Sequence, residues 1–281
     1  MNKILILGAS GFIGNIIYKE LLPYFDVYGT YRTSTKEFET NKVFFQYDLE
    51  KDDIDTILNT VQPNIIISSL RGNFNAQFET HKQVSAYVMT RENCKLLFLS
   101  TVNVFDGKYE FPSYENDEQK AKSDYGKFKV SVEKILQELP EYKYNILRLP
   151  LVLGVNSPRI LQLKQAAKHK ASFEVWPNLI ISVTTANKIA QQIHYIINKN
   201  KNGVFHLASN DVIHYDDLFS EISDKLGISL IFKSIFSSND DAYLAILSKE
   251  NKLPKNYRIT VSQVIEDCTL KDEIITLKNK L

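Results

Sequence analysis

Along the chain, short continuous runs of apolar residues alternate with longer stretches in which apolar residues recur every three or four positions. A continuous run is typical of a parallel strand that is buried on both faces, and the longer spacing is typical of an amphipathic helix. The alternation predicts an α/β protein with helices on both faces of a parallel sheet. The strands predicted from the runs are 3–9 (KILILGA), 26–32 (DVYGTYR), 42–48 (KVFFQYD), 64–70 (NIIISSL), 95–101 (KLLFLST) and 144–149 (YNILRL).

Helices are predicted between these strands. In the first of them Ile13, Ile17 and Leu21 recur at helical spacing, and Pro23 closes the pattern. We expect a larger sheet domain over 1–155, with returning elements from about 180–210, and a smaller α/β region over 156–281 that packs closely against it. The other predicted helices lie around 54–61, 79–92, 124–138, 158–169, 185–198 and 215–227, with two more strands at 172–176 (SFEVW) and 203–209 (GVFHLAS).

Three glycines, Gly8, Gly11 and Gly14, follow the first strand at intervals of three and open the first helix. The first glycine of such a set allows a sharp turn, the second lets the backbone approach a pyrophosphate, and the third lets the helix pack against the sheet. Amides at the helix N-terminus then hold the phosphates without a cationic side chain. Because strand, glycines and helix occur in this order, we interpret residues 1–155 as a Rossmann-type, doubly wound dinucleotide-binding domain rather than a tight turn without a ligand.

Composition narrows the possible partners. The 281 residues include 34 Lys and Arg against 33 Asp and Glu, so no basic excess points to nucleic acid or to an anionic membrane surface. No apolar stretch reaches transmembrane length and the first strand begins without a leader, which predicts a soluble cytoplasmic protein. Cys94 and Cys268 are isolated from other ligand-type residues, so we expect neither a metal site nor a disulfide.

A tyrosine followed four residues later by a lysine occurs three times, at Tyr47, Tyr125 and Tyr195. Tyr47 ends a predicted strand, and Tyr195 lies late in a helix of the smaller region. Only Tyr125 comes after the fifth strand, on a predicted helix where Lys129 shares its face. A nearby ammonium lowers the pKa of a tyrosine, which otherwise lies near 10. We therefore expect Tyr125 and Lys129 to act together, beside the strand end that supplies Thr101.

The glycine turn reads GASGFIG (8–14), a GxxGxxG form that resembles the extended short-chain dehydrogenase/reductase family. Four further stretches resemble its dTDP-4-dehydrorhamnose reductase branch: STVNVFDG (100–107), YENDEQKAKSDYGKFKVSVEK (114–134), ILRLPLVLG (146–154) and ISVTTANKIAQQI (181–193). The chain departs from this branch at Val102 and Asn103, where members usually carry Asp and Tyr. His81 stands near the position of a helical Asn in relatives, and the segment 71–92 is shorter.

The resemblance implies roles for individual residues. Tyr125 would donate a proton to a substrate carbonyl, Lys129 would hold the nicotinamide ribose, and Thr101 would hydrogen-bond the substrate oxygen. The substrate is assigned to Val102, Asn103 and Trp176, although a single tryptophan is more often a packing residue. The cofactor is assigned to Gly8, Ser10, Gly11, Phe12, Ile13, Gly14, Arg32, Asp48, Leu49, Ser69, Leu70, Tyr125 and Lys129, with Asp48 and Leu49 beside the adenine.

The cofactor preference is predicted from the end of the second strand. Enzymes that prefer NAD usually carry an acidic residue there, which accepts a hydrogen bond from the 2′-hydroxyl of the adenosine ribose. Here GTYRTSTK (29–36) has Arg32 and Lys36 and no carboxylate. A guanidinium can pair with a 2′-phosphate through two hydrogen bonds. We therefore expect NADP(H), with NAD(H) as the alternative.

Together these features predict an NADPH-dependent reductase of a nucleotide-linked 4-keto-6-deoxy sugar, with the smaller region binding the substrate. A sugar-nucleotide epimerase or dehydratase on the same scaffold is one alternative, but dehydratases follow the active-site Thr with Asp-Glu, where this chain has Val102 and Asn103. A catalytically silent NADP-binding regulatory subunit is the other, against which the retained Thr101, Tyr125 and Lys129 argue. The expected partner is the nucleotide sugar, and a homodimer is left open.

Overall fold

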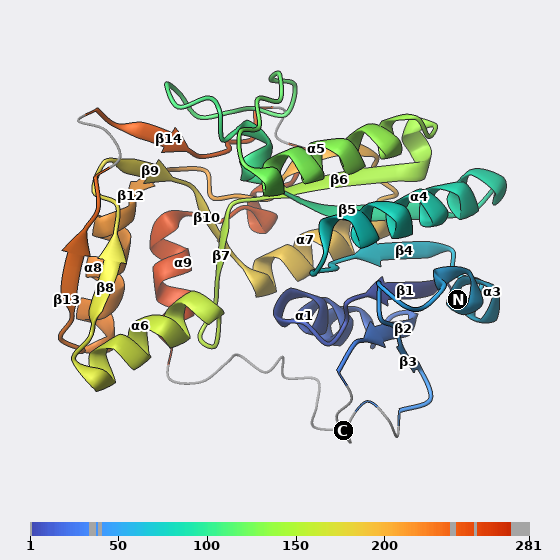
Figure 1. Ribbon diagram of the computed structural model, residues 1–281, viewed down its shortest axis with the longest axis horizontal. Helices are drawn as coiled ribbons and strands as arrows, with labels where there is room; N and C mark the ends of the chain where they lie inside the picture. Colours follow the sequence, from blue (N-terminus) through green and yellow to red (C-terminus); the bar gives the residue numbers. More distant parts are fainter. Residues whose placement is uncertain (1, 34–37, 39–40, 237–239, 250–251, 271–281) are drawn as a thin grey trace.

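The computed structural model describes residues 2–33, 38, 41–236, 240–249 and 252–270 (Figure 1). A seven-stranded sheet with the order β11-β6-β5-β4-β1-β2-β3 forms its centre. All of its strand pairs are parallel, so the doubly wound sheet predicted from the sequence is confirmed. Its strands are β1 (Lys3–Leu7), β2 (Asp26–Tyr31), β3 (Phe44–Gln46), β4 (Ile65–Ser68), β5 (Lys95–Thr101), β6 (Tyr144–Leu149) and β11 (Gly203–His206).

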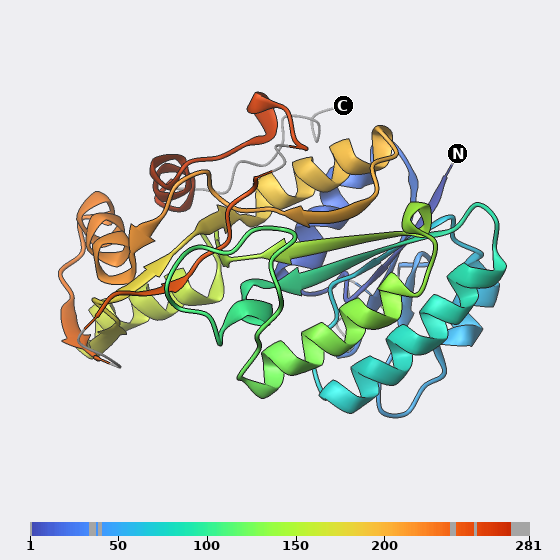
Figure 2. The ribbon, with the colours of Figure 1, turned by 90° about the horizontal axis from the view of Figure 1, so that it is seen from above.

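Helices cover both faces of this sheet (Figure 2). Strand β1 shows why the apolar runs are continuous: Ile4 and Ile6 point into one apolar core, and Leu5 and Leu7 point into another. Because every residue of such a strand meets a helix layer, none can be polar without a buried partner. One face carries α1 (Phe12–Leu21) and α7 (Ala186–Asn198), and the other carries α3 (Ile54–Val61), α4 (Phe74–Thr90) and α5 (Asp124–Gln137).

The chain leaves the sheet after β6 and returns to it later. Helix α7 packs against α1, and β11 pairs with β6 in the register Gly203↔Asn145. Returning elements were expected from about 180–210, and α7 and β11 lie at Ala186–Asn198 and Gly203–His206. The division of the chain at residue 155 stays a prediction, because elements from both sides of it complete one sheet.

The smaller part has its own core, which includes Leu163, Phe173, Phe219 and Val264. Its helices are α6 (Pro158–His169), α8 (Tyr215–Leu226) and α9 (Val261–Cys268), joined by β7 (Leu151–Leu153), β8 (Ser172–Val175), β9 (Leu179–Ile181), β10 (Val183–Thr185), β12 (Ile213–His214), β13 (Ile231–Ser234) and β14 (Ala242–Leu244). Three short 3₁₀ helices complete the described elements: η1 (Val102–Phe105), η2 (Glu141–Lys143) and η3 (Lys255–Tyr257).

Local capping explains two differences from the predicted helices. Helix α4 begins at Phe74 rather than near 79, because the side chain of Asn73 accepts a hydrogen bond from Ala76 N (3.1 Å) and caps the first turn. Helix α9 was not predicted, although Thr260 and Gln263 cap each other's backbone amides in a capping box. No helix in the described parts of the chain is long and apolar enough to cross a membrane.

Strand β1 pairs with β2 on one side and with β4 on the other, so the chain order reverses there. In open α/β sheets such a reversal leaves a crevice at the carboxyl ends of the strands, where ligands bind. The turn after β1 needs glycines for steric reasons. Gly8 has φ +82°, and a Cβ on Gly14 would lie 2.2 Å from the Gly8 carbonyl oxygen and 2.7 Å from Ser69 Oγ.

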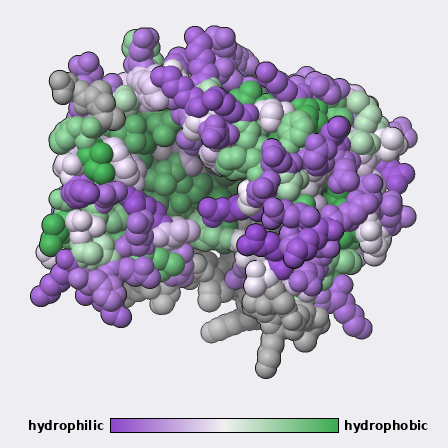
Figure 3. Space-filling model, viewed as in Figure 1, coloured by the Kyte–Doolittle hydropathy of each residue, from purple (hydrophilic) through white to green (hydrophobic). Residues whose placement is uncertain are grey.

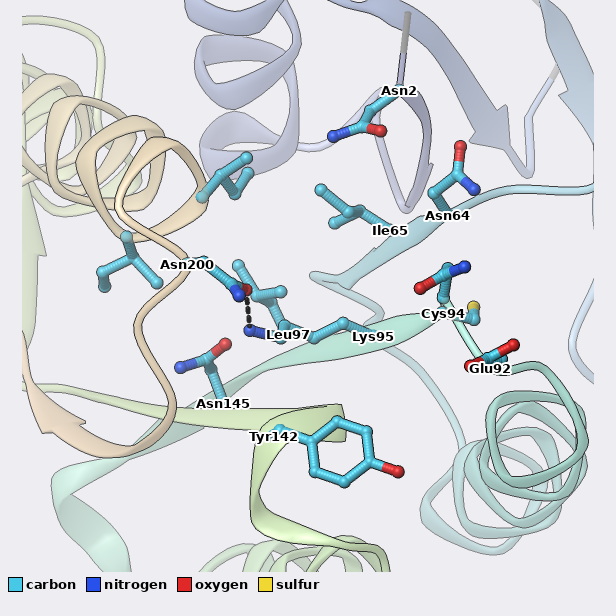
Figure 4. Close-up of a pocket in the computed structure, with 13 residues that line it drawn as sticks. Asn2, Asn64, Ile65, Glu92, Cys94, Lys95, Leu97, Tyr142, Asn145 and Asn200 are labelled. Atoms are coloured by element: carbon cyan, nitrogen blue, oxygen red, sulfur yellow. Dashed lines mark hydrogen bonds between the residues drawn. The ribbon is translucent and has the colours of Figure 1, made fainter.

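A cavity of about 400 Å³ opens at the opposite, amino-terminal ends of β4, β5 and β6 (Figure 4). Lys95 lies inside it and donates to Asn200 Oδ1 (2.9 Å), the Lys201 carbonyl (3.1 Å) and Asn202 Oδ1 (2.5 Å). An ammonium has three donors, and these contacts use all of them. Lys95 therefore ties the loop after α7 to the start of β5.

We expect Gly14→Ala to lower the free energy of unfolding by about 1–3 kcal/mol, the cost of overpacking a tight site. The added methyl would meet backbone and Ser69 Oγ at less than contact distance. Gly11→Ala is the matched control, because Gly11 has an ordinary φ of −76° and its Cβ would lie 3.3 Å from the Gly8 oxygen. Thermal melting of both variants checks this, and an unchanged melting temperature for Gly14→Ala would contradict it.

Candidate active site

A cleft opens at the carboxyl ends of the central strands, between the sheet and the smaller part. It consists of two adjoining cavities, of about 310 Å³ on the side of β5 and about 280 Å³ on the side of β2. Figure 3 shows a hollow with a largely apolar floor on this face. Of the residues predicted from the sequence, the cleft brings together Gly8, Ser10, Gly11, Phe12, Ile13, Gly14, Arg32, Leu49, Ser69, Leu70, Thr101, Tyr125 and Lys129.

The turn after β1 brings the N-terminus of α1 to this cleft. Gly11 N donates to the Gly8 carbonyl (3.0 Å), and Gly8 N donates to Thr30 Oγ1 (2.9 Å), which closes the turn. The first turn of α1 carries no acidic residue, so the positive end of the helix dipole faces the cleft without compensation. This arrangement fits a phosphate group of a dinucleotide.

Helix α5 carries Tyr125 and Lys129, and its start is fixed by Asp106. The Asp106 carboxylate accepts hydrogen bonds from Lys122 N and from the hydroxyl of Ser123. Ser123 Oγ in turn caps the helix by accepting from Gly126 N (3.0 Å). The position of Tyr125 thus depends on a buried carboxylate in the loop that follows β5.

Lys129 is buried among apolar side chains, with 5% of its surface exposed. Its Nζ donates to the Leu99 carbonyl (2.9 Å) and lies 4.4 Å from the centre of the Phe98 ring. Burial lowers the pKa of Lys129 to about 7; the carboxylate of Glu133 raises this pKa and the guanidinium of Arg71 lowers it further. The site therefore holds a lysine that can gain or lose its charge near neutral pH.

Tyr125 lies beside Thr101 at the mouth of the cleft. Tyr125 keeps 40% of its surface exposed. Partial burial raises its pKa above 10, while a hydrogen bond with Thr101 and the charge of Arg71 lower it in part. The lowering of the Tyr125 pKa that was expected from Lys129 is not found: the Lys129 ammonium lies 5.8 Å from the ring centre, the positive charge that acts on Tyr125 is that of Arg71, and the effect of burial is larger. Tyr125 therefore keeps its proton at neutral pH.

The residues after Thr101 differ in what they contact. Thr101 Oγ1 donates to Asn103 Oδ1 (3.0 Å) and accepts from Asn103 N (3.2 Å), so Asn103 orients the hydroxyl. Val102, expected to contact substrate, is instead buried in an apolar cluster with Val104 and Phe105. The side chain of Val102 does not line the cleft, because η1 turns it toward the protein interior.

His81 is a buried structural residue. Its Nδ1 lies 2.6 Å from the Gln77 carbonyl, which can only accept, so Nδ1 carries the proton. Nε2 then accepts from the hydroxyl of Ser68 (2.8 Å). Burial lowers the pKa of His81 to about 3, so it is neutral and ties α4 to the end of β4.

Four further residues named from the sequence have different positions. Arg32 is exposed at the end of β2 and lines the cleft, whereas Lys36 lies outside the described residues. Asp48 does not line the cleft: its carboxylate accepts from Glu50 N (3.2 Å) and caps a turn. Trp176 packs edge-to-face on Tyr215 (5.2 Å between ring centres) in the smaller core, as expected for a packing residue.

Two arginines in the cleft were missed by sequence reasoning. Arg71 lines both cavities, and its charge acts on Tyr125 and Lys129. Arg159, in the first turn of α6, donates to the Glu174 carbonyl (2.7 Å) and lies 4.0 Å from the Phe173 ring centre. The position of Arg71, directly after the fourth strand, is a signal that could have identified it. Arg159 has no comparable signal.

Within the described residues, no group of three or more His, Cys, Asp and Glu side chains could hold a metal ion. The cleft contains the phenol of Tyr125, the ammonium of Lys129, the hydroxyl of Thr101 and three guanidinium groups, beside a glycine turn that fits phosphates. Such groups can bind anionic ligands and deliver a proton to an oxygen atom.

The sequence matches the family described as "RmlD substrate binding domain" over residues 1–243. The chain belongs to this family. It is an extended short-chain dehydrogenase/reductase of the RmlD type, and thereby an NAD(P)-dependent oxidoreductase of the sugar-nucleotide class. A comparison with curated proteins finds no match.

Solved structures with the same fold include enzymes of more than one reaction. A dTDP-4-dehydrorhamnose reductase from Clostridium acetobutylicum has a TM-score of 0.76 and 21% identity, covering 94% of this chain and 98% of its own. The same enzyme from Bacillus anthracis, in complex with NADP, has a TM-score of 0.76 and 18% identity, covering 94% of this chain and 97% of its own. A dTDP-glucose 4,6-dehydratase from Bacillus anthracis, in complex with NAD, has a TM-score of 0.78 and 15% identity, covering 96% of this chain and 96% of its own.

We expect Lys129→Met to raise the melting temperature, and to raise it most at about pH 6. An unfolded lysine has a pKa near 10.4, while that of folded Lys129 is about 7. Between these two pKa values the unfolded state of the unmodified protein binds more protons than the folded state, so its stability rises with pH over that range. Below about pH 7 the folded protein carries the full cost of the buried charge. Melting curves should show a smaller gain at about pH 9. The control is Lys127→Met, because Lys127 lies on the same helix and is exposed, so its loss should change the melting temperature little at either pH. A lower melting temperature of Lys129→Met at about pH 6 would refute the expectation.

Proposed function

We propose that the chain is an NADPH-dependent reductase of a nucleotide-linked 4-keto-6-deoxy sugar. The observation that carries this proposal is the cluster of Thr101, Tyr125 and Lys129 in the cavity that also contains Gly11 and Gly14 of the phosphate-binding turn. A proton donor and a dinucleotide site in one cleft are what the reduction of a carbonyl requires.

The residues have separate roles in the proposed reaction. A bound NADPH would supply the hydride to the carbonyl carbon. Tyr125 gives its proton to the carbonyl oxygen as negative charge develops there, and Thr101 orients that oxygen by a hydrogen bond. Lys129 binds the nicotinamide ribose, and the charge of Arg71 favours the Tyr125 phenolate that remains, until solvent returns the proton. The raised pKa of Tyr125 keeps the donor protonated before each turnover.

Features of the cleft support the proposed substrate class. Leu149, Pro150, Leu151 and Val152 form an apolar wall, which suits the methyl group of a 6-deoxy sugar. Arg71 lines the same cavity and would bind an anion such as the diphosphate of a sugar nucleotide. Val102 and Asn103 follow Thr101 in place of the Asp-Glu pair of dehydratases, which favours reduction over dehydration.

We expect Tyr125→Phe to lower turnover by about 10²–10⁴-fold, the usual contribution of a positioned acid. The affinity for NADPH should change little, because Lys129 and the glycine turn make the proposed cofactor contacts. The measurement is reduction of a panel of nucleotide-linked 4-keto sugars, followed at the nicotinamide absorbance, with cofactor binding measured in parallel.

Tyr195→Phe is the control for this experiment. Tyr195 also precedes a lysine by four residues, but it lies on α7 and packs on Tyr257 (4.6 Å between ring centres), so the change should leave turnover unaltered. Unchanged turnover of Tyr125→Phe would refute the mechanism. An unmodified protein that binds NADPH and reduces no sugar of the panel would favour a regulatory subunit instead.

Arg32→Ala should reduce the preference for NADPH over NADH. A charge-assisted contact with the 2′-phosphate contributes about 1.5–3 kcal/mol, or roughly ten- to a hundredfold in affinity. Titration of both cofactors into both proteins measures the change, and the affinity for NADH should stay nearly constant. Equal affinities for the two cofactors in the unmodified protein would rule out a role of Arg32 in this preference.

A further inference from the structure

One turn after Lys129 on α5, Glu133 is fully buried in a charged network beneath the cleft. Its carboxylate accepts two hydrogen bonds from Arg148 of β6, from Nη2 (2.8 Å) and Nε (3.2 Å). Ser100 of β5 and Gln119 also donate to it. Both carboxylate oxygens of Glu133 are therefore occupied by hydrogen bonds from other elements of the fold.

Arg148 connects this carboxylate to other parts of the chain. Its Nη1 donates to the Glu115 carbonyl (2.9 Å) and lies 3.3 Å from His206 Nε2. The Glu115 carboxylate accepts from the hydroxyl of Ser248 (2.6 Å), in the segment after β14. Both Glu133 and Arg148 are therefore locked in place from several elements, and neither can turn toward solvent.

The titratable and charged groups that lie near Lys129 come from α5, from the segment after β4 and from α4. Tyr125 and Glu133 share its helix, Arg71 follows β4, and His81 faces it from α4. His81 is neutral, because burial lowers its pKa to about 3. Arg71 is positive, so Glu133 is the only negative charge among these described groups.

Residues at positions i and i+4 of a helix are neighbours, and a charge interaction is strong when both partners are out of water. Lys129 and Glu133 have this spacing, and both are buried. Resting on the proposed function, we infer that Glu133 is a positioning residue that keeps the buried Lys129 in its charged form during catalysis. The ion pair with Arg148 holds Glu133 in place for this task.

The test is the titration of Lys129 in the cofactor-free protein, followed by NMR of ¹³C-labelled lysine side chains. Lys129→Met identifies the signal. In Glu133→Gln, the loss of the negative charge should lower the Lys129 pKa from about 7 by about one unit. A merely structural role predicts the opposite sign, because a loosened core would let water reach Lys129 and raise its pKa toward 10.4. A raised or unchanged pKa overturns the inference.

Two further variants complete the experiment. If Glu133→Gln does not fold with Arg148 unpaired, Glu133→Gln combined with Arg148→Gln removes both charges, and a smaller fall in the Lys129 pKa is expected; an unchanged or raised value again overturns the inference. The control is Glu20→Gln, which breaks a partly buried contact with His194 (2.8 Å) between α1 and α7. Glu20→Gln should leave the pKa of Lys129 unchanged. A fall in this pKa as large as that in Glu133→Gln overturns the assignment to Glu133.

The same variants separate this inference from the proposed reaction. In Glu133→Gln, the alkaline limb of kcat/KM for the keto sugar should move to lower pH by the shift seen in the titration. The titration needs no substrate. If the Lys129 pKa falls as expected in Glu133→Gln while the unmodified protein reduces no keto sugar, the role of Glu133 holds and the proposed function fails.

Discussion

The close contact between the turn after β1 and the end of β4 is the constraint on which the cleft depends. Ser69 Oγ donates to the Leu7 carbonyl (2.9 Å), and Gly14 approaches the turn so closely that no Cβ fits. This contact brings the first helix against the sheet at the point where the strand order reverses. It aligns the positive end of α1 with the strand ends that carry Ser69, Arg71 and Thr101, and so makes one cleft from several loops.

Most of the fold follows from sequence pattern because a doubly wound sheet imposes strong local signals. Each central strand must be apolar on both faces, and each covering helix must present one apolar stripe. Continuous apolar runs therefore identify the strands, and apolar residues at every third or fourth position identify the helices. The strands of the smaller part, such as β12 and β14, have two or three residues and pair mainly through long-range contacts. Periodicity cannot identify elements that short, and they were missed.

The candidate site was predicted where chemistry depends on spacing along one helix or turn. Tyr125 and Lys129 share a helix face, and the three glycines share a turn. What the sequence does not show is the effect of burial on charge: the pKa of Lys129 falls and that of Tyr125 rises because of groups brought together by folding. The sequence also does not show that Val102, a neighbour of Thr101, is turned into the protein interior by η1. Since a reductase and a dehydratase share this fold with the chain, the reaction is decided by such residues and not by the scaffold.

The late return of α7 and β11 to the sheet has a consequence for how the protein is made on the ribosome. Until about residue 206 has been synthesised, β6 is an uncovered edge strand and the apolar face of α1 lacks α7. An unpaired edge beside an apolar surface is a template for pairing with other chains. The nascent chain must therefore pass through residues 151–185, which belong to the smaller part, before the central sheet gains its last strand, so completion of the sheet depends on a segment that lies outside it.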